Sequence, residues 1–513
     1  MSIIIKVLVF AFLITTNEAA KILAMFPVPS ISHQVVFRPL TQELAKRGHD
    51  VTVITPDPAF PKGQTPPNFT EIDIHDLSYM KWQELLKHTS KPGTTMLEML
   101  KIGFKVIINI TETQFKDEAV QQLLKENNSY DLLLIEASVR PALVLSHIFK
   151  VPVIQISSLG PLRFNLETVG SSWHPLLYPN HFNQRIYNLT KWEKVMQLWD
   201  YYRLESYMDS MVDVEHEMVK RLFGPDVPSP KELQKSVHML FLNIHPLWEG
   251  NRPVPPSVIY MGGVHQKPIS ELPADLKNYL DASENGVIYM SLGTNVKPSL
   301  LPSEKVQMIV NVFSQLPYDV IWKWDEDELP GRTENIRISK WLPQSDLLRH
   351  PKIKLFITQG GLQSTDEAIT AGVPMVGIPM IGDQWYNVEK YVYHKIGVKI
   401  DMVTLNEEDF KNAIYTVIGD DSYRRNVERL RTLMTDQPQT PLERAVWWTE
   451  HVLRHGGGHH LRSPAANITW SKYLELDLVL TLLLIAFVII LVIFTLVYAL
   501  FKCICNSGKT KND

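Results

Sequence analysis

Cysteine is almost absent from this chain. Of its 513 residues only Cys503 and Cys505 are cysteines, and both lie at the extreme C-terminus. The body of the protein therefore has no pair of cysteines from which a disulfide could form. The two tail cysteines lie beside a predicted membrane span, where they are either palmitoylated or remain free thiols.

Long basic runs, short-period repeats and low-complexity tracts are also missing, and the formal net charge is -4 at pH 7. Nucleic-acid binding relies on clustered lysine and arginine, so no nucleic acid is expected as a partner. The chain is too long for one ordinary domain and predicts two, each able to bury a core.

The N-terminal stretch has the pattern of a targeting segment. Residues 1–20 contain Lys6, an apolar core at residues 7–14 and small residues at Ala19 and Ala20. This pattern predicts a cleaved secretory signal peptide. A first buried strand is the alternative.

The C-terminal stretch predicts a membrane anchor. Residues 474–501 are expected to form a transmembrane helix, because almost all of them are apolar and the run is long enough to cross a bilayer core of about 30 Å. Lys502, Lys509 and Lys511 follow in residues 502–513, as the positive-inside rule requires of a cytosolic tail. Lys509 and Lys511 resemble a dilysine retrieval signal of the endoplasmic reticulum, although a solvated charged tail would look the same.

Between these ends lie N-x-Ser/Thr sequons, which a lumenal body would expose to glycosylation. They are Asn68, Asn109, Asn127, Asn188 and Asn467.

Residues 21–250 are predicted to form the first α/β domain. A strand, a helix from His33 to Gly48 and a second strand follow one another closely, and such a βαβ unit favours parallel strands. Residues 173–224 are aromatic, show a helical pattern, and could line a lipophilic pocket. The strands expected in this half are residues 22–27, 51–54, 130–135 and 151–156.

Residues 251–440 are predicted to form the second domain, after a proline-rich segment at residues 251–257. Strands and helices alternate here, which indicates a doubly wound sheet with ligands at the carboxyl ends of its strands. The expected strands are residues 286–292, 320–324, 337–339, 354–358 and 373–378.

The most informative segment is Phe356 to Gln384, FITQGGLQSTDEAITAGVPMVGIPMIGDQ. An apolar strand runs into Gly360 and Gly361 and then into a helical pattern. Glycine at such a turn lets a ligand approach the backbone, and the free N–H groups of the helix that follows favour a phosphate.

Two flanking pairs of residues complete a nucleotide-sugar pattern. Upstream, Trp341 offers a flat face for a base, and Gln344 offers an amide for a ribose. Downstream, Asp383 and Gln384 offer a carboxylate and an amide that suit sugar hydroxyls. Base, ribose, phosphate and sugar therefore each have a candidate partner.

These segments resemble the signature of the family 1 UDP-glycosyltransferases, insect-type membrane-bound members included. The resemblance extends from Lys21 to the C-terminal tail. It implies an α/β GT-B fold, in which two Rossmann-like doubly wound domains face a cleft, plus one C-terminal transmembrane helix. The first domain would bind the acceptor and the second the UDP-sugar, and residues 441–473 would return to the first domain before the membrane.

The resemblance also implies which residues bind the donor. Trp341 would stack on uracil, Gln344 and Glu367 would bind ribose, and Asp383 and Gln384 would hold the sugar. The residues expected at the diphosphate are Ser291, Thr294, Gly361, Gln363 and Ser364.

Gln359 departs from the family pattern. Many members have histidine at this position, where it contacts the diphosphate, whereas an amide can donate a hydrogen bond but carries no charge. The Gln-Gly-Gly version is similar to insect-type members, so we interpret it as variation and not as loss of activity.

His33 is the candidate catalytic base. It lies at the start of a helix, whose partial positive charge favours the neutral imidazole that can accept a proton. The resemblance places the family's catalytic histidine at this position. A carboxylate usually orients such a histidine, and Glu136 takes the place where the family commonly has aspartate. The alternative for Glu136 is a surface carboxylate at a strand end.

The implied reaction is a single displacement with inversion, which moves a hexose from a UDP-sugar to a small lipophilic alcohol such as a phenol, flavonoid or steroid, for detoxification or inactivation. No Asp-x-Asp triplet of the metal-dependent sort is identified beside the donor motif, so no metal and no permanently bound cofactor are expected. The helix dipole and hydrogen bonds would then neutralise the leaving diphosphate.

UDP-glucose is the favoured cosubstrate, since insect-type relatives generally use it. UDP-glucuronate is the alternative, with Arg252 as the possible contact of the sugar carboxylate. A non-catalytic, membrane-anchored carrier of lipophiles is the alternative from another class. The expected location is the endoplasmic reticulum membrane, as a single-pass type I protein with lumenal catalytic domains. Association with copies of itself or with other chains stays open.

Overall fold

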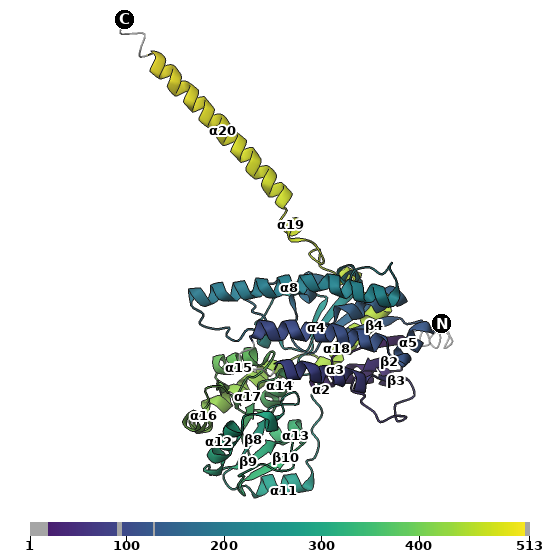
Figure 1. The fold of residues 1–513 in the computed structure, drawn as a ribbon, viewed down its shortest axis with the longest axis vertical. Helices are drawn as coiled ribbons and strands as arrows, with labels where there is room; N and C mark the ends of the chain where they lie inside the picture. Colours follow the sequence, from purple (N-terminus) through teal and green to yellow (C-terminus); the bar gives the residue numbers. More distant parts are fainter. Residues whose placement is uncertain (1–18, 90–94, 127–128, 508–513) are drawn as a thin grey trace, which may run out of the picture.

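The computed structural model describes residues 19–89, 95–126 and 129–507. These residues form two parallel sheets with helices around each, and a long C-terminal helix that projects from the body (Figure 1). The predicted signal peptide lies outside the described residues apart from its last two positions, and so do Asn127, Lys509 and Lys511.

The first sheet has seven parallel strands in the order β3-β2-β1-β4-β5-β6-β7. Its central strands are mostly apolar and, apart from Lys21 at the start of β1, buried, as expected for a parallel sheet covered on both faces. The order reverses between β1 and β4, and such switch points form crevices for ligands. The strands are β1 (Lys21–Met25), β2 (Asp50–Thr55), β3 (Phe69–Asp73), β4 (Leu132–Glu136), β5 (Val153–Ser157), β6 (Val237–Leu242) and β7 (Val258–Tyr260).

The longest helix of this half is α8, which begins after a capping box formed by Thr190 and Glu193. It packs against α4 and η1. The helices of this half are α2 (Ile31–Lys46), α3 (His75–Thr89), α4 (Met96–Phe115), α5 (Glu118–Lys125), η1 (Arg140–Leu143), α6 (Val144–Phe149), α7 (Arg163–Val169), α8 (Lys191–Phe223), α9 (Pro230–Leu233), η2 (Gln234–Ser236) and α10 (Pro246–Glu249).

The second sheet has six parallel strands in the order β10-β9-β8-β11-β12-β13, with its switch point between β8 and β11. The strands are β8 (Val287–Ser291), β9 (Asp319–Lys323), β10 (Ile336–Ser339), β11 (Ile353–Thr358), β12 (Met375–Gly377) and β13 (Gly397–Lys399). The helices are α11 (Ala274–Ala282), η3 (Pro298–Leu300), α12 (Ser303–Ser314), α13 (Gln344–Leu348), α14 (Leu362–Ala371), α15 (Gln384–Tyr393), α16 (Glu407–Gly419) and α17 (Ser422–Thr435).

The predicted division between residues 250 and 251 does not coincide with the division between the sheets. Strand β7 follows the proline-rich segment, yet it pairs with β6 in the first sheet. The prolines interrupt regular structure only locally, and a strand of three residues is too short to give a hydrophobic signal of its own. The chain reaches the second sheet only at β8.

After α17 the chain returns to the first half. Helix α18 (Pro441–Arg454) buries Ala445 and Val446 in the same cluster as Phe37 of α2. The guanidinium of Arg47 donates to Glu450 over 3.3 Å. The chain therefore crosses between the halves twice.

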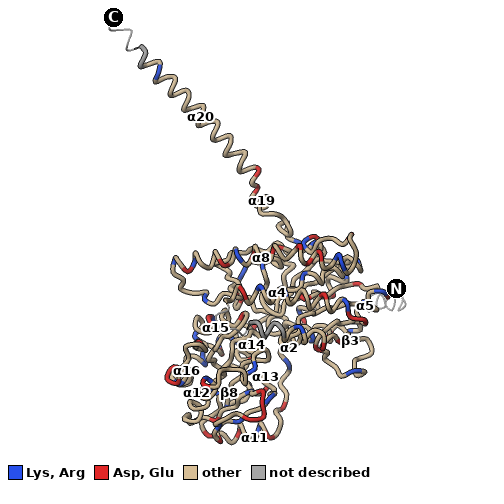
Figure 2. Tube along the Cα trace, viewed as in Figure 1, with Lys and Arg blue, Asp and Glu red and all other residues tan. Residues whose placement is uncertain are grey.

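The final helix, α20 (Leu476–Ser507), follows η4 (His459–Leu461) and α19 (Trp470–Tyr473). By length and composition it can cross a membrane. Figure 2 shows charged residues near its two ends and none along its middle. Its apolar side chains are exposed along its length.

Two of the described sequon residues are exposed, and two use their side-chain amides. Asn109 and Asn188 are exposed. Asn68 donates from Nδ2 to the carbonyl of His49 at 2.8 Å, and Asn467 donates to the carbonyl of Thr168 at 3.1 Å.

A buried ion pair joins α8 to the segment that follows β4. Arg140 donates from Nη2 to Glu215 Oε1 at 3.0 Å and to the carbonyl of Met208 at 2.9 Å. Burial raises the pKa of Glu215, and Arg140 opposes that shift. The arginine thus keeps a desolvated carboxylate paired.

We expect Arg140→Met to lower the free energy of unfolding by about 3 kcal/mol, because it leaves the Glu215 carboxylate buried without its partner. Thermal unfolding of the full chain in detergent measures the change. Lys277→Met, which removes an exposed pair with Asp281, is the control and should change the midpoint little. Equal effects of both substitutions would contradict the argument.

Candidate active site

A cavity of about 620 Å³ lies between the carboxyl ends of the two sheets, and residues of both halves line it. The first half contributes His33 and Ser158, and the second contributes Trp341, Gln359 and Asp383. Both switch points therefore open into one space, as expected for ligands in open parallel sheets.

His33 lies in the first turn of α2, because β1 ends at Met25 and a short loop leads directly into the helix. Its Nδ1 lies 2.7 Å from Glu136 Oε1 and 3.0 Å from Ser158 Oγ. Since a carboxylate only accepts hydrogen bonds, this contact places the imidazole proton on Nδ1. Nε2 then keeps a lone pair that can accept a proton from a substrate.

Glu136 ends β4, the strand next to β1, so the parallel register brings its carboxylate to the His33 loop. The residue is buried. Its second oxygen, Oε2, accepts the backbone N–H of Val28 at 3.1 Å. Each carboxylate oxygen thus has a donor within the His33 loop or α2, which fixes the group in place.

Trp341 lies between β10 and α13, Gln344 is the first residue of α13, and both line the cavity. The Trp341 side chain is 66% exposed, and the ammonium of Lys323 lies 4.7 Å from its ring centroid. A large aromatic face left open toward a cavity is suited to stack on a planar ligand.

Gln344 is held in one orientation by its neighbours. Its Oε1 accepts from Tyr289 Oη at 3.0 Å, while Nε2 donates to Ser364 Oγ at 2.9 Å and to Glu367 Oε2 at 2.7 Å. Burial raises the pKa of Glu367, and the bond from Gln344 partly offsets this. Gln344, Ser364 and Glu367, expected around the ribose and diphosphate, thus form one connected group.

The turn from β11 to α14 contains Gly360 at φ +88 and Gly361 as the N-cap of α14. A Cβ on Gly360 would lie 2.5 Å from a methyl carbon of Val388, so the turn requires glycine. The first turn of this ten-residue helix presents its N–H groups beside Gln363 and Ser364, which both line the cavity.

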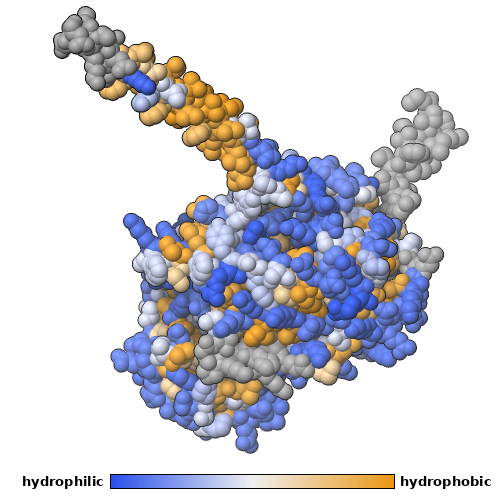
Figure 3. All heavy atoms as spheres, turned by 45° about the horizontal axis from the view of Figure 1, so that its top comes forward, coloured by the Kyte–Doolittle hydropathy of each residue, from blue (hydrophilic) through white to orange (hydrophobic). Residues whose placement is uncertain are grey.

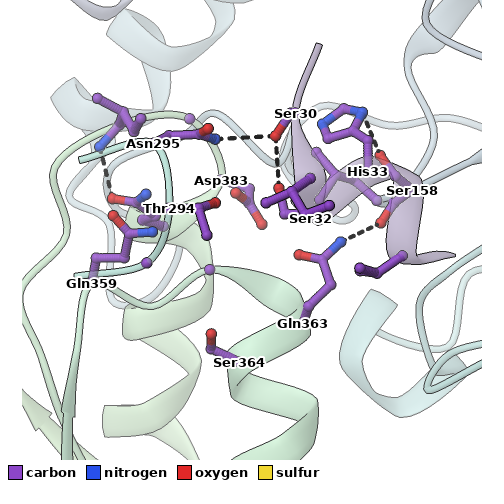
Figure 4. A pocket seen from close by; sticks show the side chains of 18 of the residues that line it. Ser30, Ser32, His33, Ser158, Thr294, Asn295, Gln359, Gln363, Ser364 and Asp383 are labelled. Atoms are coloured by element: carbon purple, nitrogen blue, oxygen red, sulfur yellow. Dashed lines mark hydrogen bonds between the residues drawn. The ribbon is translucent and has the colours of Figure 1, made fainter. Parts of the chain in front are cut away.

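Gln359 packs against the turn that follows β8. A Cβ on Gly293, whose φ is +79, would lie 2.1 Å from Gln359 Nε2. Gln359 Oε1 is buried and has no hydrogen-bond partner among the described residues. Ser291 and Thr294, at the same turn, also line the cavity. Figure 4 shows Gln359 close to Thr294 at this turn.

Asp383 and Gln384 lie at the start of α15. Gln384 Oε1 accepts the N–H groups of Met380 and Ile381, at 2.7 and 2.8 Å. Asp383 Oδ2 accepts from Asn387 Nδ2 at 2.8 Å. Burial raises the pKa of Asp383, and the hydrogen bond from Asn387 opposes the shift. In Figure 4 Asp383 lies between His33 and the Thr294 turn.

Hydrogen bonds connect the halves around the cavity. Asn295 Nδ2 donates to Ser30 Oγ at 3.3 Å, and Gln363 Nε2 donates to the carbonyl of Ser158 at 3.1 Å (Figure 4). Behind the cavity, Trp248 Nε1 donates to Asn387 Oδ1 at 2.9 Å. Asn387 therefore links Trp248 of the first half to Asp383 of the second half through two hydrogen bonds.

Arg252 is placed differently from the other candidates. It is buried and donates from Nη2 and Nε to Glu249 Oε1, at 2.8 and 2.9 Å. The second oxygen of Glu249 lies 2.8 Å from His181 Nε2. Arg252 lies outside the set of described residues that line the cavity.

Apolar side chains of the first half also line the cavity. Helix α4 contributes Met99, Leu100, Phe104 and Ile107, and α3 contributes Trp82. This part of the cavity wall is suited to an apolar ligand.

An Asp-x-Asp triplet does occur upstream, at residues 325–327. The carboxylate of Asp325 accepts from Ser299, and Asp327 pairs with Lys340 at 2.8 Å. Both aspartates lie outside the described cavity lining. No group of three or more metal-ligating side chains occurs among the described residues.

Several residues at this site were not predicted from the sequence. Ser158 comes directly after β5, the strand beside β4, so a hydroxyl at that strand end was an available signal. Asn387 lies four residues after Asp383, on the same face of α15. His181 and Asn295 lie in loops, where no periodic pattern indicated their position.

Comparison with known proteins agrees with this geometry. Residues 20–511 match the family described as UDP-glucoronosyl and UDP-glucosyl transferase. An ecdysteroid UDP-glucosyltransferase of Spodoptera littoralis nuclear polyhedrosis virus is 40% identical over 506 residues, which cover 94% of this chain and 97% of the viral protein. UDP-glucosyltransferase 2 of Dactylopius coccus is 32% identical over 493 residues, with 93% and 92% covered.

Solved structures support the fold. The crystal structure of a UDP-glucose: anthocyanidin 3-O-glucosyltransferase in complex with UDP is similar with a TM-score of 0.57. The match covers 85% of this chain and 100% of that chain at 16% identity. Together with the two parallel sheets, this similarity confirms the predicted GT-B fold.

We expect Gly293→Ala to destabilise the protein by about 1–3 kcal/mol, because alanine rarely adopts this φ and its methyl group would displace Gln359. The thermal midpoint measures the loss. Gly419→Ala is the control: no atom lies within 4 Å of its added Cβ, so the midpoint should hold or rise slightly. A stable Gly293→Ala variant would show that the turn is not constrained.

Proposed function

Because this chain belongs to the UDP-glucoronosyl and UDP-glucosyl transferase family and is a UDP-glycosyltransferase, we propose that it transfers glucose from UDP-glucose to the hydroxyl group of a small lipophilic acceptor. The observation that carries this proposal is the 2.7 Å contact of His33 Nδ1 with Glu136. It orients an imidazole in the cavity that Asp383 also lines.

In this proposal His33 is the general base. Its Nε2 accepts the proton of the acceptor hydroxyl while that oxygen forms a bond to the anomeric carbon of glucose. The bond from that carbon to the UDP oxygen breaks on the opposite face, which inverts the configuration from α to β. Glu136 holds the imidazole tautomer and stabilises the imidazolium that forms. The departing UDP takes the bonding electron pair.

Different residues are proposed to bind the uracil, ribose, diphosphate and glucose parts of the donor. Trp341 stacks on uracil, and the carboxylate of Glu367, steadied by Gln344, accepts from the ribose hydroxyls. The N–H groups at the start of α14, with Ser364, Gln359 and Thr294, stabilise the charge that develops on the diphosphate. Asp383 and Gln384 hold the glucose hydroxyls. For Gln384 the free donor is Nε2, since Oε1 is occupied by backbone N–H groups.

Glucose is favoured over glucuronate by the position of Arg252. A glucuronate carboxylate would need a cation, and the guanidinium of Arg252 is already paired with the buried carboxylate of Glu249. The relatives named above are glucosyltransferases by name.

The acceptor is proposed from the apolar wall. Met99, Phe104 and Trp82 line the same cavity as His33. An acceptor with one reactive hydroxyl on a flat, hydrophobic frame, such as a phenol, flavonoid or steroid, fits this surface. Glycosylation adds a polar sugar and thereby inactivates or detoxifies such a compound.

The main test is UDP release by full-length protein in membranes, with UDP-glucose or UDP-glucuronate and a panel of phenols and steroids. We expect release with UDP-glucose, and a fall in kcat of at least about a hundredfold in His33→Gln and in Glu136→Gln. UDP affinity, measured by calorimetry, should stay near the wild-type value in both variants.

The alternatives give different results in this assay. Release with UDP-glucuronate alone would overturn the choice of donor. No release from folded protein that still binds UDP and a lipophile would indicate a carrier. Trp341→Ala is the matched variant on the donor side, and it should raise the KM for UDP-glucose with less effect on kcat.

We also propose that α20 spans the endoplasmic reticulum membrane, with both sheets lumenal and the tail cytosolic. In that compartment Asn109 and Asn188 are the favoured glycosylation sites, since they are exposed whereas Asn68 and Asn467 use their amides in hydrogen bonds.

This placement predicts a gel shift on treatment with an N-glycosidase, for protein expressed in insect cells. Asn109→Gln and Asn188→Gln should each remove part of the shift. Asn68→Gln should leave it unchanged. A shift that persists in a triple variant of Asn109, Asn127 and Asn188 would overturn the site assignment, and no shift at all would contradict a lumenal body.

A further inference from the structure

The first third of α8 exposes a stripe of large apolar side chains that the proposed reaction does not use. Trp192, Val195, Trp199 and Tyr202 are spaced by three or four residues and therefore lie on one face of the helix. All four are exposed, with Trp192 at 70% and Trp199 at 60%. Singly exposed hydrophobic residues are ordinary, but an aromatic stripe indicates a contact surface.

The stripe is not the face by which α8 packs on the body. Leu204, Met208 and Met211 are buried on the other side of the helix. Further along, positions on the same face as the stripe are occupied by Asp213 and Glu217, which are exposed and polar. The apolar outer face is therefore confined to one end of α8.

The membrane anchor begins close to this end of the helix. The ring of Trp173 lies 5.5 Å from that of Tyr201 on α8 and 5.1 Å from that of Trp470 on α19, measured between centroids. Between Trp470 and the start of α20 at Leu476, the chain can extend by at most about 20 Å. Figure 1 shows α8 along the side of the body from which α19 and α20 leave.

We propose that the stripe from Trp192 to Tyr202 lies in the interfacial region of the bilayer, beside the point where α20 enters. Tryptophan and tyrosine favour this region, because their rings bury an apolar face while their polar atoms stay hydrated. Trp470 and Tyr473, both exposed at the base of α20, continue the same belt. Figure 3 shows α20 as an apolar surface and further apolar patches on the body.

The charges on this end of α8 fit a lipid surface. Lys191 and Lys194 are exposed beside the stripe, and Arg203, which is also exposed, lies 3.6 Å from Asp200 Oδ1. Cationic side chains that flank an apolar helix face bind the phosphate groups of lipids. The bilayer is therefore favoured over a second copy of the chain as the occupant.

This position would give the bilayer a route to the active site, a consequence that rests on the proposed function. A second cavity of about 290 Å³ lies against α8, lined in part by Met196 and Tyr201. It shares Leu100 and Phe182 with the larger cavity. A lipophilic acceptor dissolved in the membrane would then pass between α4 and α8 toward His33.

The test uses the full chain in lipid nanodiscs of phosphatidylcholine and phosphatidylserine, with Cys503→Ser and Cys505→Ser. A fluorophore is attached at Val195→Cys, and quenching by lipids with doxyl-labelled acyl chains is measured. The control sites are Val403→Cys, which is exposed on the second half, and Ile490→Cys in the middle of α20. We expect quenching at position 195 to be several-fold greater than at position 403, and strong quenching at position 490.

The pattern of quenching distinguishes docking of α8 on the bilayer from a protein partner and tests the membrane span separately. Quenching at position 490 with none at 195 would overturn docking of α8 and leave the span intact. A blue-shifted but unquenched label at position 195 would indicate a protein partner, which also overturns the proposal. No quenching at either position would overturn the span as well. Trp192→Ser with Trp199→Ser should reduce quenching at 195 while the thermal midpoint stays unchanged, since both side chains are exposed.

Discussion

A buried carboxylate needs a hydrogen-bond donor for each oxygen, and Glu136 meets this constraint with His33 on one oxygen and Val28 on the other. This requirement ties the end of β4 to the loop after β1 and to the first turn of α2. The same two strands flank the switch point of the first sheet. The position and orientation of the His33 imidazole thus follow from the order of the strands and from the free-energy cost of burying the Glu136 carboxylate without hydrogen-bond donors.

The second half is positioned relative to this imidazole by polar contacts that are buried or partly buried. Trp248 fixes Asn387, Asn387 fixes Asp383, and Gln363 reaches the carbonyl of Ser158 beside His33. Asp383, which lines the cavity, is therefore supported by Asn387 and Trp248, which lie outside the described cavity lining. Supporting hydrogen bonds of this kind hold functional side chains in their productive geometry.

The long apolar runs allowed the fold to be predicted, because a buried parallel strand needs little beyond hydrophobic residues and a break at each end. Strands β3, β6, β7 and β13 were not predicted, although β6 is itself a buried run of six residues. The three-residue edge strands β7 and β13 gave no such signal, and β7 extends the first sheet beyond the predicted boundary. The positions of Trp341 and Asp383 followed from the motif. The pairing of Arg252 with Glu249 could not be predicted, since it depends on which of several nearby groups each buried charge meets in the folded chain.

The two crossings between the halves have a mechanical consequence. One leads from β7 to α11 and the other from α17 to α18, and both ends of the second half are thereby held by the first. A movement of the two halves relative to each other would have to change the backbone of both segments. A body joined through one segment could rotate about it in any direction, whereas two joining segments restrict the directions in which the halves can separate.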